Sequence, residues 1–223
     1  QEVIEDFAVE LQVRNDGRLD VTERITVQAE GDKIQRGIYR DIPVTYRLPS
    51  GLLRKTPIDL LSATRDGEAE SVRRESQGAY QRFYLGSPHI QLDPGRYVYE
   101  LRYRVDPQLL QRPDEDELYW NVTGTQFPRV VTASVTVNVP GGVQEVFCSA
   151  GPVGADDPCP TRLIDQGVGR FVATTIAAGD PLTIAAKLAA RRAGAGTDAC
   201  PVPYEAKAAV VRVKTTSCPL SLS

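Results

Sequence analysis

The sequence predicts an all-β protein, an antiparallel β-sandwich of immunoglobulin-like or jelly-roll-like topology with few short helices. Three observations favour this fold class. Apolar residues recur at every second position in several segments, which is the periodicity of a strand with one buried face. Glycine and proline turns separate these segments. Extended stretches with the periodicity of an amphipathic helix are absent from the sequence.

The clearest strands lie in three places. Residues 7–13 and 19–27 alternate on either side of the turn Asn15-Asp16-Gly17 and predict a β-hairpin. Residues 97–105 alternate after a turn at 93–95, and residues 133–139 alternate before Gly141 and Gly142. Weaker strand candidates occupy residues 57–64, 81–85, 118–122, 143–147, 170–174, 182–188 and 206–213.

These segments divide the chain into two parts. A chain of 223 residues is long enough to bury a core of its own, and we assign residues 1–188 to one extracytoplasmic sandwich domain. Residues 189–223 form a linker and a tail: the stretch 189–197 is rich in Ala, Arg and Gly, and the rest carries one strand candidate and two cysteines. The tail is therefore expected to be stapled by a disulfide and to pack back onto the sandwich.

The charge balance argues against one class of partner. With 26 basic and 29 acidic residues the net charge is −3, and the isoelectric point is near 5.4. Such a chain has no basic surplus with which to neutralise several phosphates. Nucleic acid is therefore not an expected partner.

The start of the chain and its cysteines predict the compartment. The chain begins with Gln1 and contains no Met, as after removal of a secretory signal peptide, although a fragment trimmed at a domain edge would begin in the same way. The four cysteines, an even number, favour an oxidising compartment. They allow three pairings, of which the local one, Cys148 with Cys159 and Cys200 with Cys218, is favoured because near neighbours meet most easily.

Metal sites and membrane spans find little support. The cysteine spacings lack the short Cys-x-x-Cys clusters of zinc sites, and His89 is the only histidine. We therefore expect no metal and no cofactor. No run of about 20 apolar residues is present, so these residues are not expected to span a membrane.

Two further motifs carry a resemblance to a known family. GIYRDIP at residues 37–43 follows an acidic turn, and YWNVTG at residues 119–124 follows a strongly acidic loop. With the N-terminal hairpin and the stretch 92–103, they occur in the order found in a family of predicted membrane proteins, catalogued as domain of unknown function 2207 (DUF2207). Residues 3 to about 139 resemble that family, and after Cys148 only residues 182–188 do.

The resemblance implies a signal peptide, an extracytoplasmic β-rich domain, membrane helices and a Gly/Ser-rich tail, but no established activity. This chain lacks the helices and carries cysteines, so it is expected to be an ectodomain or a secreted variant. Membrane anchoring would then come through segments outside this chain.

The two motifs supply the candidate binding residues Arg40, Asp41, Tyr119, Trp120 and Asn121. An arginine and the sole tryptophan would offer a ligand or partner a charged clamp and an aromatic platform. The alternative is a structural role, because tryptophans commonly fill sandwich cores and buried arginines tie loops to strands. In both cases the motifs are expected to meet in space, with Arg40 against the Trp120 indole.

Three functions follow as hypotheses. The first is a non-enzymatic ectodomain of a membrane-anchored envelope protein that binds or scaffolds an envelope protein or glycan. The second is a carbohydrate-binding module. The third is an envelope hydrolase that uses carboxylates of the loop 114–117; no serine-nucleophile motif is present, and no catalytic residue is assigned. The carbohydrate-binding module would use a platform of Tyr84, Tyr97, Tyr99, Tyr103 and Trp120.

Overall fold

The computed structural model describes residues 2–47, 53–106, 109–111, 115–124, 127–152, 154 and 157–189. Within these ranges the protein consists of strands and turns and contains no helix. The predicted all-β sandwich is therefore confirmed, whereas the few short helices do not occur in the described part of the chain.

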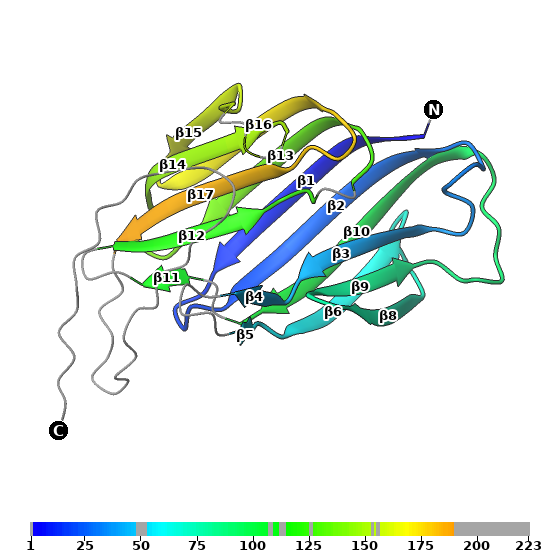
Figure 1. Ribbon diagram of the computed structural model, residues 1–223, viewed down its shortest axis with the longest axis horizontal. Coiled ribbons are helices and arrows are strands. Elements are labelled where there is room, and N and C mark those ends of the chain that lie inside the picture. The colour runs from blue at the N-terminus through cyan, green and yellow to red at the C-terminus, as the bar shows by residue number, and fades with distance from the viewer. Residues whose placement is uncertain are drawn as a thin grey trace.

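The back layer in Figure 1 is one large sheet of eight strands. Their order is β15-β16-β13-β1-β2-β10-β6-β7. Every neighbouring pair in it is antiparallel except β1 and β13, which run parallel. The bounds are β1 (Val3–Val13), β2 (Leu19–Ala29), β6 (Ile58–Arg65), β7 (Glu68–Ala69), β10 (Gly95–Val105), β13 (Val130–Asn138), β15 (Thr161–Asp165) and β16 (Val168–Ile176).

Three smaller sheets cover one face of the large sheet (Figure 1). One has the order β11-β12-β17-β14, the second β3-β9-β8, and the third pairs β4 with β5. Since β11 and β12 lie in this second layer, the chain leaves the large sheet after β10 and returns to it through β13. The bounds are β3 (Ile38–Pro43), β4 (Thr45–Arg47), β5 (Leu53–Lys55), β8 (Val72–Gln77), β9 (Tyr80–Leu85), β11 (Leu109–Gln111), β12 (Glu115–Asn121), β14 (Val143–Ala150) and β17 (Leu182–Ala189).

The core lies between the two layers. It is formed by the apolar side chains at every second position of the strands. In β1 the side chains of Phe7, Val9 and Leu11 are buried, whereas Glu10 and Gln12 between and after them are exposed. β2, β10 and β13 repeat this pattern. Each large apolar side chain removed from water in this way contributes about 1.5–3 kcal/mol, so the alternation fixes which face of the large sheet is covered.

The segments with the strongest alternation are the ones found as long strands of the large sheet. The structure adds several strands that lack a clear apolar period, among them β8 and β15, which are mostly exposed. β17 ends at Ala189, next to the predicted domain boundary. The tail that follows, with Cys200, Cys218 and the strand predicted over 206–213, lies outside the described residues.

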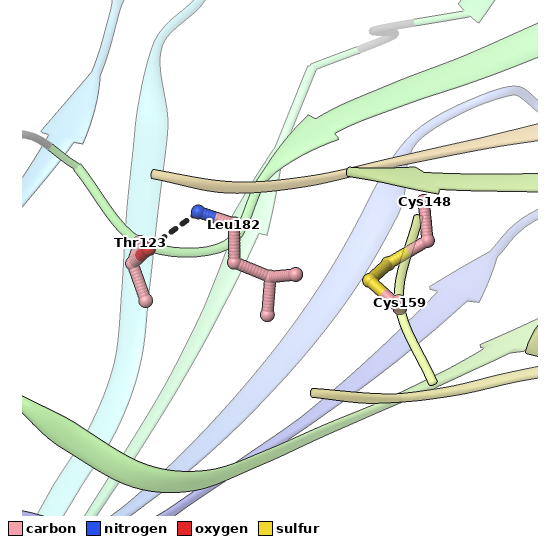
Figure 2. The surroundings of a disulfide bond; sticks show 4 residues. All are labelled: Thr123, Cys148, Cys159 and Leu182. Carbon is pink, nitrogen blue, oxygen red and sulfur yellow. Dashed lines mark hydrogen bonds between the residues drawn. A yellow bond between two sulfur atoms is a disulfide. The ribbon is translucent and has the colours of Figure 1, made fainter. Parts of the chain in front are cut away.

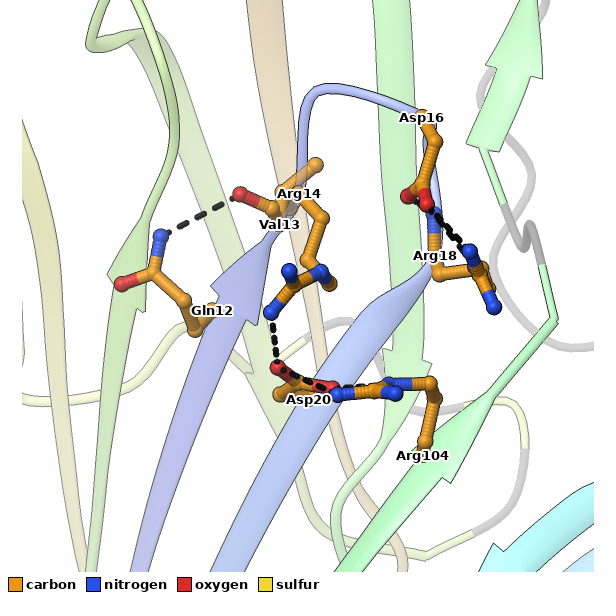
Figure 3. A network of polar contacts seen from close by, with 7 residues as sticks. All are labelled: Gln12, Val13, Arg14, Asp16, Arg18, Asp20 and Arg104. Atoms are coloured by element: carbon orange, nitrogen blue, oxygen red, sulfur yellow. Dashed lines mark hydrogen bonds and ion pairs between the residues drawn. The ribbon is translucent and has the colours of Figure 1, made fainter.

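A polar network fastens the tip of the predicted hairpin to the sheet (Figure 3). Gly17 takes a positive φ of 85° in the turn. The Asp16 carboxylate accepts hydrogen bonds from the backbone and the side chain of Arg18. The Asp20 carboxylate accepts from Arg14 Nη1 at 2.8 Å and from Arg104 Nε at 2.6 Å. Because Arg104 belongs to β10 and Arg14 to the turn, Asp20 of β2 joins two strands and the turn at this end.

Candidate functional site

Arg40 lies in β3 with its side chain inside the sandwich, where it is 2% exposed. Its Nε donates to Oε2 of Glu23 at 2.7 Å, and its Nη2 donates to Oε1 of the same carboxylate at 2.9 Å. Nη2 also donates to the carbonyl oxygen of Val122 at 2.9 Å. Arg40 therefore connects the large sheet to the segment that follows β12, and brings the first motif into contact with the second.

Two phenylalanines flank the Arg40 guanidinium. Its central carbon lies 4.9 Å from the ring centroid of Phe127 and 5.6 Å from that of Phe7. The two rings stack on each other, with centroids 5.4 Å apart. Phe127 and Phe7 thus supply the aromatic contact that the sequence assigned to Trp120.

In this buried cluster the Arg40 side chain stays charged and the Tyr103 hydroxyl stays neutral. Burial opposes the charge on Arg40, but the Glu23 carboxylate beside it raises the pKa of Arg40 above its usual value. Burial raises the pKa of Tyr103 well above 10, so its hydroxyl stays protonated and donates to Glu23 Oε1 at 2.8 Å. Removing either partner of this ion pair would leave a buried charge without a partner and would destabilise the domain. The geometry therefore supports a structural role for Arg40.

Asp41 faces the other way, because neighbouring residues of a strand point to opposite sides. Its two carboxylate oxygens accept from Nε and Nη2 of Arg82 in β9, each at 2.6 Å. The Arg82 guanidinium lies 4.2 Å from the ring centroid of Tyr39, which is 47% exposed. Arg73 of β8 lies 4.0 Å from the ring centroid of Tyr84. We call this outer surface of β3-β9-β8, formed by Tyr39, Asp41, Arg73, Arg82 and Tyr84, the Tyr–Arg face.

Hydrogen bonds within the Tyr–Arg face shift the pKa values of its side chains. The hydrogen bonds to Asp41 raise the pKa of Arg82, which stays charged. A hydrogen bond from Arg82 lowers the pKa of Tyr84. Of this face the sequence predicts only Asp41 and Tyr84 as binding candidates, although Tyr80, Arg82 and Tyr84 alternate along β9. That alternation is the signal that could have found it.

The side chains of the second motif also alternate between the core and the outer surface of the sheet. In β12, Leu118 and Trp120 are buried, whereas Tyr119 and Asn121 are half-buried on the outer side of the sheet. Trp120 is 4% exposed, and its Nε1 has no hydrogen-bond partner among the described residues. Asn121 Oδ1 accepts from the Thr183 hydroxyl at 3.0 Å. The predicted set of five therefore does not share one surface.

Figure 2 shows how the end of this motif is held. Thr123 is 1% exposed, and its hydroxyl oxygen accepts from the backbone N–H of Leu182 at 2.7 Å. The disulfide between Cys148 and Cys159, which the local pairing predicts, is present. It lies near this hydrogen bond (Figure 2). It ties β14 to the loop that precedes β15.

The aromatic platform expected of a carbohydrate-binding module does not form as a set. Tyr99 is 1% exposed, Tyr103 is fully buried and Trp120 faces the core, so these rings cannot stack on a ligand. Their alternation with polar residues marked the core face of a strand. Tyr97 and Tyr84 are half-buried, and the Tyr97 hydroxyl donates to the Asp93 carbonyl at 2.7 Å.

The acidic run does not form an open catalytic pair within the described residues. Asp114 lies outside them, and the next three residues belong to β12 rather than to a loop. Asp116 is 2% exposed, whereas Glu115 and Glu117 point to the outer side. Glu115 lies 3.6 Å from Lys187 Nζ, which also binds Glu145 at 2.8 Å. The alternation of a strand thus separates carboxylates that are adjacent in the sequence.

Other kinds of site were sought in the same residues. No group of three or more His, Cys, Asp or Glu side chains placed to hold a metal occurs among them. None of the described elements is a helix long and apolar enough to cross a membrane. The outer side of the large sheet has a shallow hollow of about 380 Å³, where Arg24 and Arg102 both bind Glu100 at 2.9 Å.

Comparisons with solved structures agree with the fold. The structure of yeast LTA4 hydrolase in complex with bestatin aligns with a TM-score of 0.54 at 11% identity, over 83% of this chain and 28% of that chain. The native LTA4 hydrolase of Saccharomyces cerevisiae aligns with a TM-score of 0.53 at 12% identity, over 83% and 29%. At these identities the likeness concerns the fold alone.

Sequence comparisons give the family. The uncharacterized protein YciQ of Escherichia coli is 34% identical over 128 residues, which are 57% of this chain and 20% of YciQ. The chain thus matches a small part of that relative. The model of the predicted membrane protein (DUF2207) N-terminal domain matches residues 3–188. The chain therefore belongs to the DUF2207 family of predicted membrane proteins.

Proposed function

We propose that this chain is the extracytoplasmic domain of a membrane protein and that it binds and scaffolds a protein partner rather than catalysing a reaction. Membership of the DUF2207 family supports the association with a membrane. The Cys148–Cys159 disulfide supports the extracytoplasmic side, because disulfides persist in oxidising compartments and are rare in the cytosol.

The observation that carries the binding role is the position of Arg82 over Tyr39. Asp41 holds the guanidinium through two bonds of 2.6 Å, so the arginine loses little further side-chain freedom when a partner binds. Tyrosine and arginine, together with tryptophan, are enriched among the residues that dominate the binding energy of protein interfaces. Tyr39 is 47% and Tyr80 45% exposed on the same small sheet, so this surface is accessible.

A protein partner fits the Tyr–Arg face better than a glycan. Sugars stack on the open face of an aromatic ring, but guanidinium groups lie over the rings of Tyr39 and Tyr84. The polar groups of the face are instead suited to a partner with backbone carbonyls and carboxylates. An envelope glycan is the competing occupant, and the experiment below distinguishes it.

The binding role is tested by crosslinking in intact cells that produce the full-length protein, followed by mass spectrometry. A partner should be recovered with the wild type and with Leu61→Ala, which removes a similarly exposed hydrophobic side chain (55% exposed) from β6. It should be lost with Tyr39→Ala. Equal recovery of the partner with both variants would contradict the proposal. A second assay measures sedimentation of the protein with purified cell-wall polysaccharide. If only Tyr39→Ala fails to sediment, the face binds a glycan instead.

The extracytoplasmic side is tested separately with fusions in the full-length protein. Alkaline phosphatase inserted after Ala189 needs an oxidising compartment to form its own disulfides, so it should be active there. β-Galactosidase at the same position should be inactive. The reverse pattern would place the domain in the cytoplasm.

A further inference from the structure

β8 (Val72–Gln77) is the outermost strand of the β3-β9-β8 sheet and has an open edge. Among the described residues it pairs with β9 alone, and β9 lies between it and β3. In Figure 1 it lies at the lower margin of the molecule. Its side chains are exposed or half-buried throughout. Such an edge presents backbone groups to which a further strand can pair.

The hydrogen bonds to β9 show which backbone groups of β8 face this edge. Ser71 comes directly before β8, and its carbonyl accepts from the N–H of Gly86, directly after β9, at 2.9 Å. Residues that bond to the neighbouring strand alternate with residues that do not along an antiparallel ladder. Counted from Ser71, the odd-numbered residues of β8 bond to β9, and the even-numbered ones direct their backbone groups to the open edge. The even-numbered residues are Val72, Arg74 and Ser76.

The charges of β8 are complementary to those of a second copy in one register. If two β8 strands pair antiparallel about a two-fold axis at Arg74, Arg73 of each copy lies opposite Glu75 of the other. Both residues then occupy closely spaced positions without backbone hydrogen bonds between them, where opposite charges stabilise a strand pair. A register centred on Arg73 or on Glu75 would instead place like charges opposite each other.

The like charges that remain directly opposite in this register are those of Arg74 and its copy. The Arg74 guanidinium lies 5.5 Å from the ring centroid of Phe83, its neighbour on β9, so the side chain leans away from the open edge. The position is also a hydrogen-bonded one, where Cα atoms of the two strands are about 5.5 Å apart rather than about 4.5 Å. The two guanidinium groups would therefore lie on opposite sides of the shared edge.

The same register continues the charge pattern of the small sheet. Asp41, Arg82 and Glu75 stand in one row across β3, β9 and β8. Arg73 of the second copy would come next in this row, so the charges would alternate in sign across four strands. Within one chain Arg73 pairs with Glu75 of its own strand, and its side chain is 58% exposed. A carboxylate of a second copy can therefore reach it from the open side.

We propose that the chain self-associates through β8, so that the three-stranded sheets of two copies join into one sheet. Charged residues on an edge strand usually oppose pairing, but here they select one register. The shared ladder would span residues 72–76, so the association is expected to be weak and to be screened by salt.

This proposal is independent of the binding role proposed for the Tyr–Arg face. Tyr39 lies on β3, which β9 separates from the shared edge, and pairing through β8 leaves it uncovered. A partner could bind at Tyr39 in a monomeric chain, and the chain could dimerise without such a partner. The two proposals therefore fail separately.

Charge exchange tests the register, in sedimentation equilibrium of the full 223-residue chain at low salt. The wild type should form dimers in a concentration-dependent way. Arg73→Glu and Glu75→Arg each place like charges opposite each other, so each variant alone should dimerise at least about tenfold more weakly. An equimolar mixture of the two variants brings opposite charges together in both pairs, and it should associate within about threefold of the wild type.

The matched controls reverse a second exposed arginine–glutamate pair, on the large sheet. The side chains of Arg96 and Glu5 are 60% and 40% exposed, against 58% and 34% for Arg73 and Glu75. Arg96→Glu and Glu5→Arg should each change the dissociation constant of the dimer by less than about threefold. A monomeric wild type, equal weakening by test and control variants, or a mixture that stays monomeric would overturn the proposal.

The backbone contribution is tested without a change of charge. Ser76→Pro removes an N–H that faces the open edge and no hydrogen bond to β9, whereas Ser76→Ala keeps that N–H. The two variants should unfold thermally at similar temperatures, and only Ser76→Pro should weaken the dimer, by at least about tenfold. Unchanged self-association of Ser76→Pro would overturn pairing through this edge.

Discussion

Arg40 and Glu23 form a two-point ion pair between the two layers of the sandwich, with side chains 2% and 0% exposed. Removal of both charges from water is costly, and their mutual attraction alone does not always offset that cost. Here further hydrogen bonds satisfy the pair: Arg40 bonds to the carbonyls of Asp41 and Val122, and Tyr103 donates to Glu23. The pair therefore fixes how β3 and the end of β12 sit on the large sheet.

Arg40→Ala should destabilise the domain by about 3–5 kcal/mol, because it leaves the Glu23 carboxylate buried without its partner. Urea unfolding followed by Trp120 fluorescence measures this. Arg82→Ala is the matched control: it breaks an arginine–carboxylate pair on the partly exposed face, so the expected loss is about 1 kcal/mol or less.

The double variant Arg40→Met with Glu23→Leu distinguishes the cause. It removes both charges and keeps most of the volume, so it should recover a large part of the stability lost in Arg40→Ala. If the double variant were as unstable as the single one, the loss would come from packing rather than from an unpaired charge.

Gly37→Ala should destabilise the domain by about 2–4 kcal/mol. Gly37 has a φ of 125°, and a Cβ there would overlap the carbonyl oxygen of Leu85. Gly86, across the same strand pair, is restricted in the same way by the carbonyl of Arg36. Thermal unfolding measures the effect.

Gly31→Ala is the control for Gly37→Ala, because its φ is 79° and no described atom lies within 4 Å of the added Cβ. It should show only the backbone strain, about 1–2 kcal/mol. Equal losses in the two variants would mean that the close approach of the Gly37 and Leu85 backbones is not rigid.

The sequence predicts the large sheet well because each of its main strands has one buried and one open face. The alternation of apolar residues from Phe7 to Val13 and from Tyr97 to Val105 therefore predicts β1 and β10. β8 is mostly exposed, so apolar patterning cannot mark it. Its position depends on pairing with β9, a contact made in space rather than a local pattern.

The candidate site shows the same limit. Contact between residues 37–43 and 119–124 follows from the need of a charged side chain for partners, and Arg40 does reach Val122. The main partner, however, is Glu23, whose position in an otherwise apolar strand face is the one sequence sign of a buried charge. Which face Asp41 takes is decided by the register of β3 with β9, and single-sequence patterns do not give that register.

Replacing both Cys148 and Cys159 by serine should lower stability by about 2–3 kcal/mol, because the disulfide closes a short loop with a sequence separation of 11 residues. Thermal unfolding of the variant and of reduced wild type should agree on this loss. A much larger loss in the variant than in the reduced wild type would mean that the serine hydroxyls are poorly accommodated, since both cysteines are less than 9% exposed.

Asp20 should make the domain sensitive to acid. Its hydrogen bonds from Arg104 and then from Arg14 hold the pKa of this carboxyl below its usual value, against the opposing effect of burial. A group whose pKa is lower in the folded state stabilises the protein above its unfolded pKa, near 3.9, and loses that contribution as the pH falls through the folded pKa. Asp20→Asn should therefore be less stable than wild type at pH 7, and the difference should shrink as the pH falls below about 4.

The control for Asp20→Asn is Asp16→Asn on the same turn. Asp16 is 44% exposed and pairs with Arg18 within the turn (Figure 3), so water and salt screen its interaction. Urea midpoints measured between pH 3 and pH 8 should converge at low pH for wild type and Asp20→Asn, while Asp16→Asn stays close to wild type throughout. If the difference caused by Asp20→Asn were independent of pH, the contribution of Asp20 would come from its shape and hydrogen bonds rather than from its charge. In that case Arg104 and Arg14 would hold the hairpin against β10 through packing and hydrogen bonds, and the charge of Asp20 would not contribute to the stability of the domain.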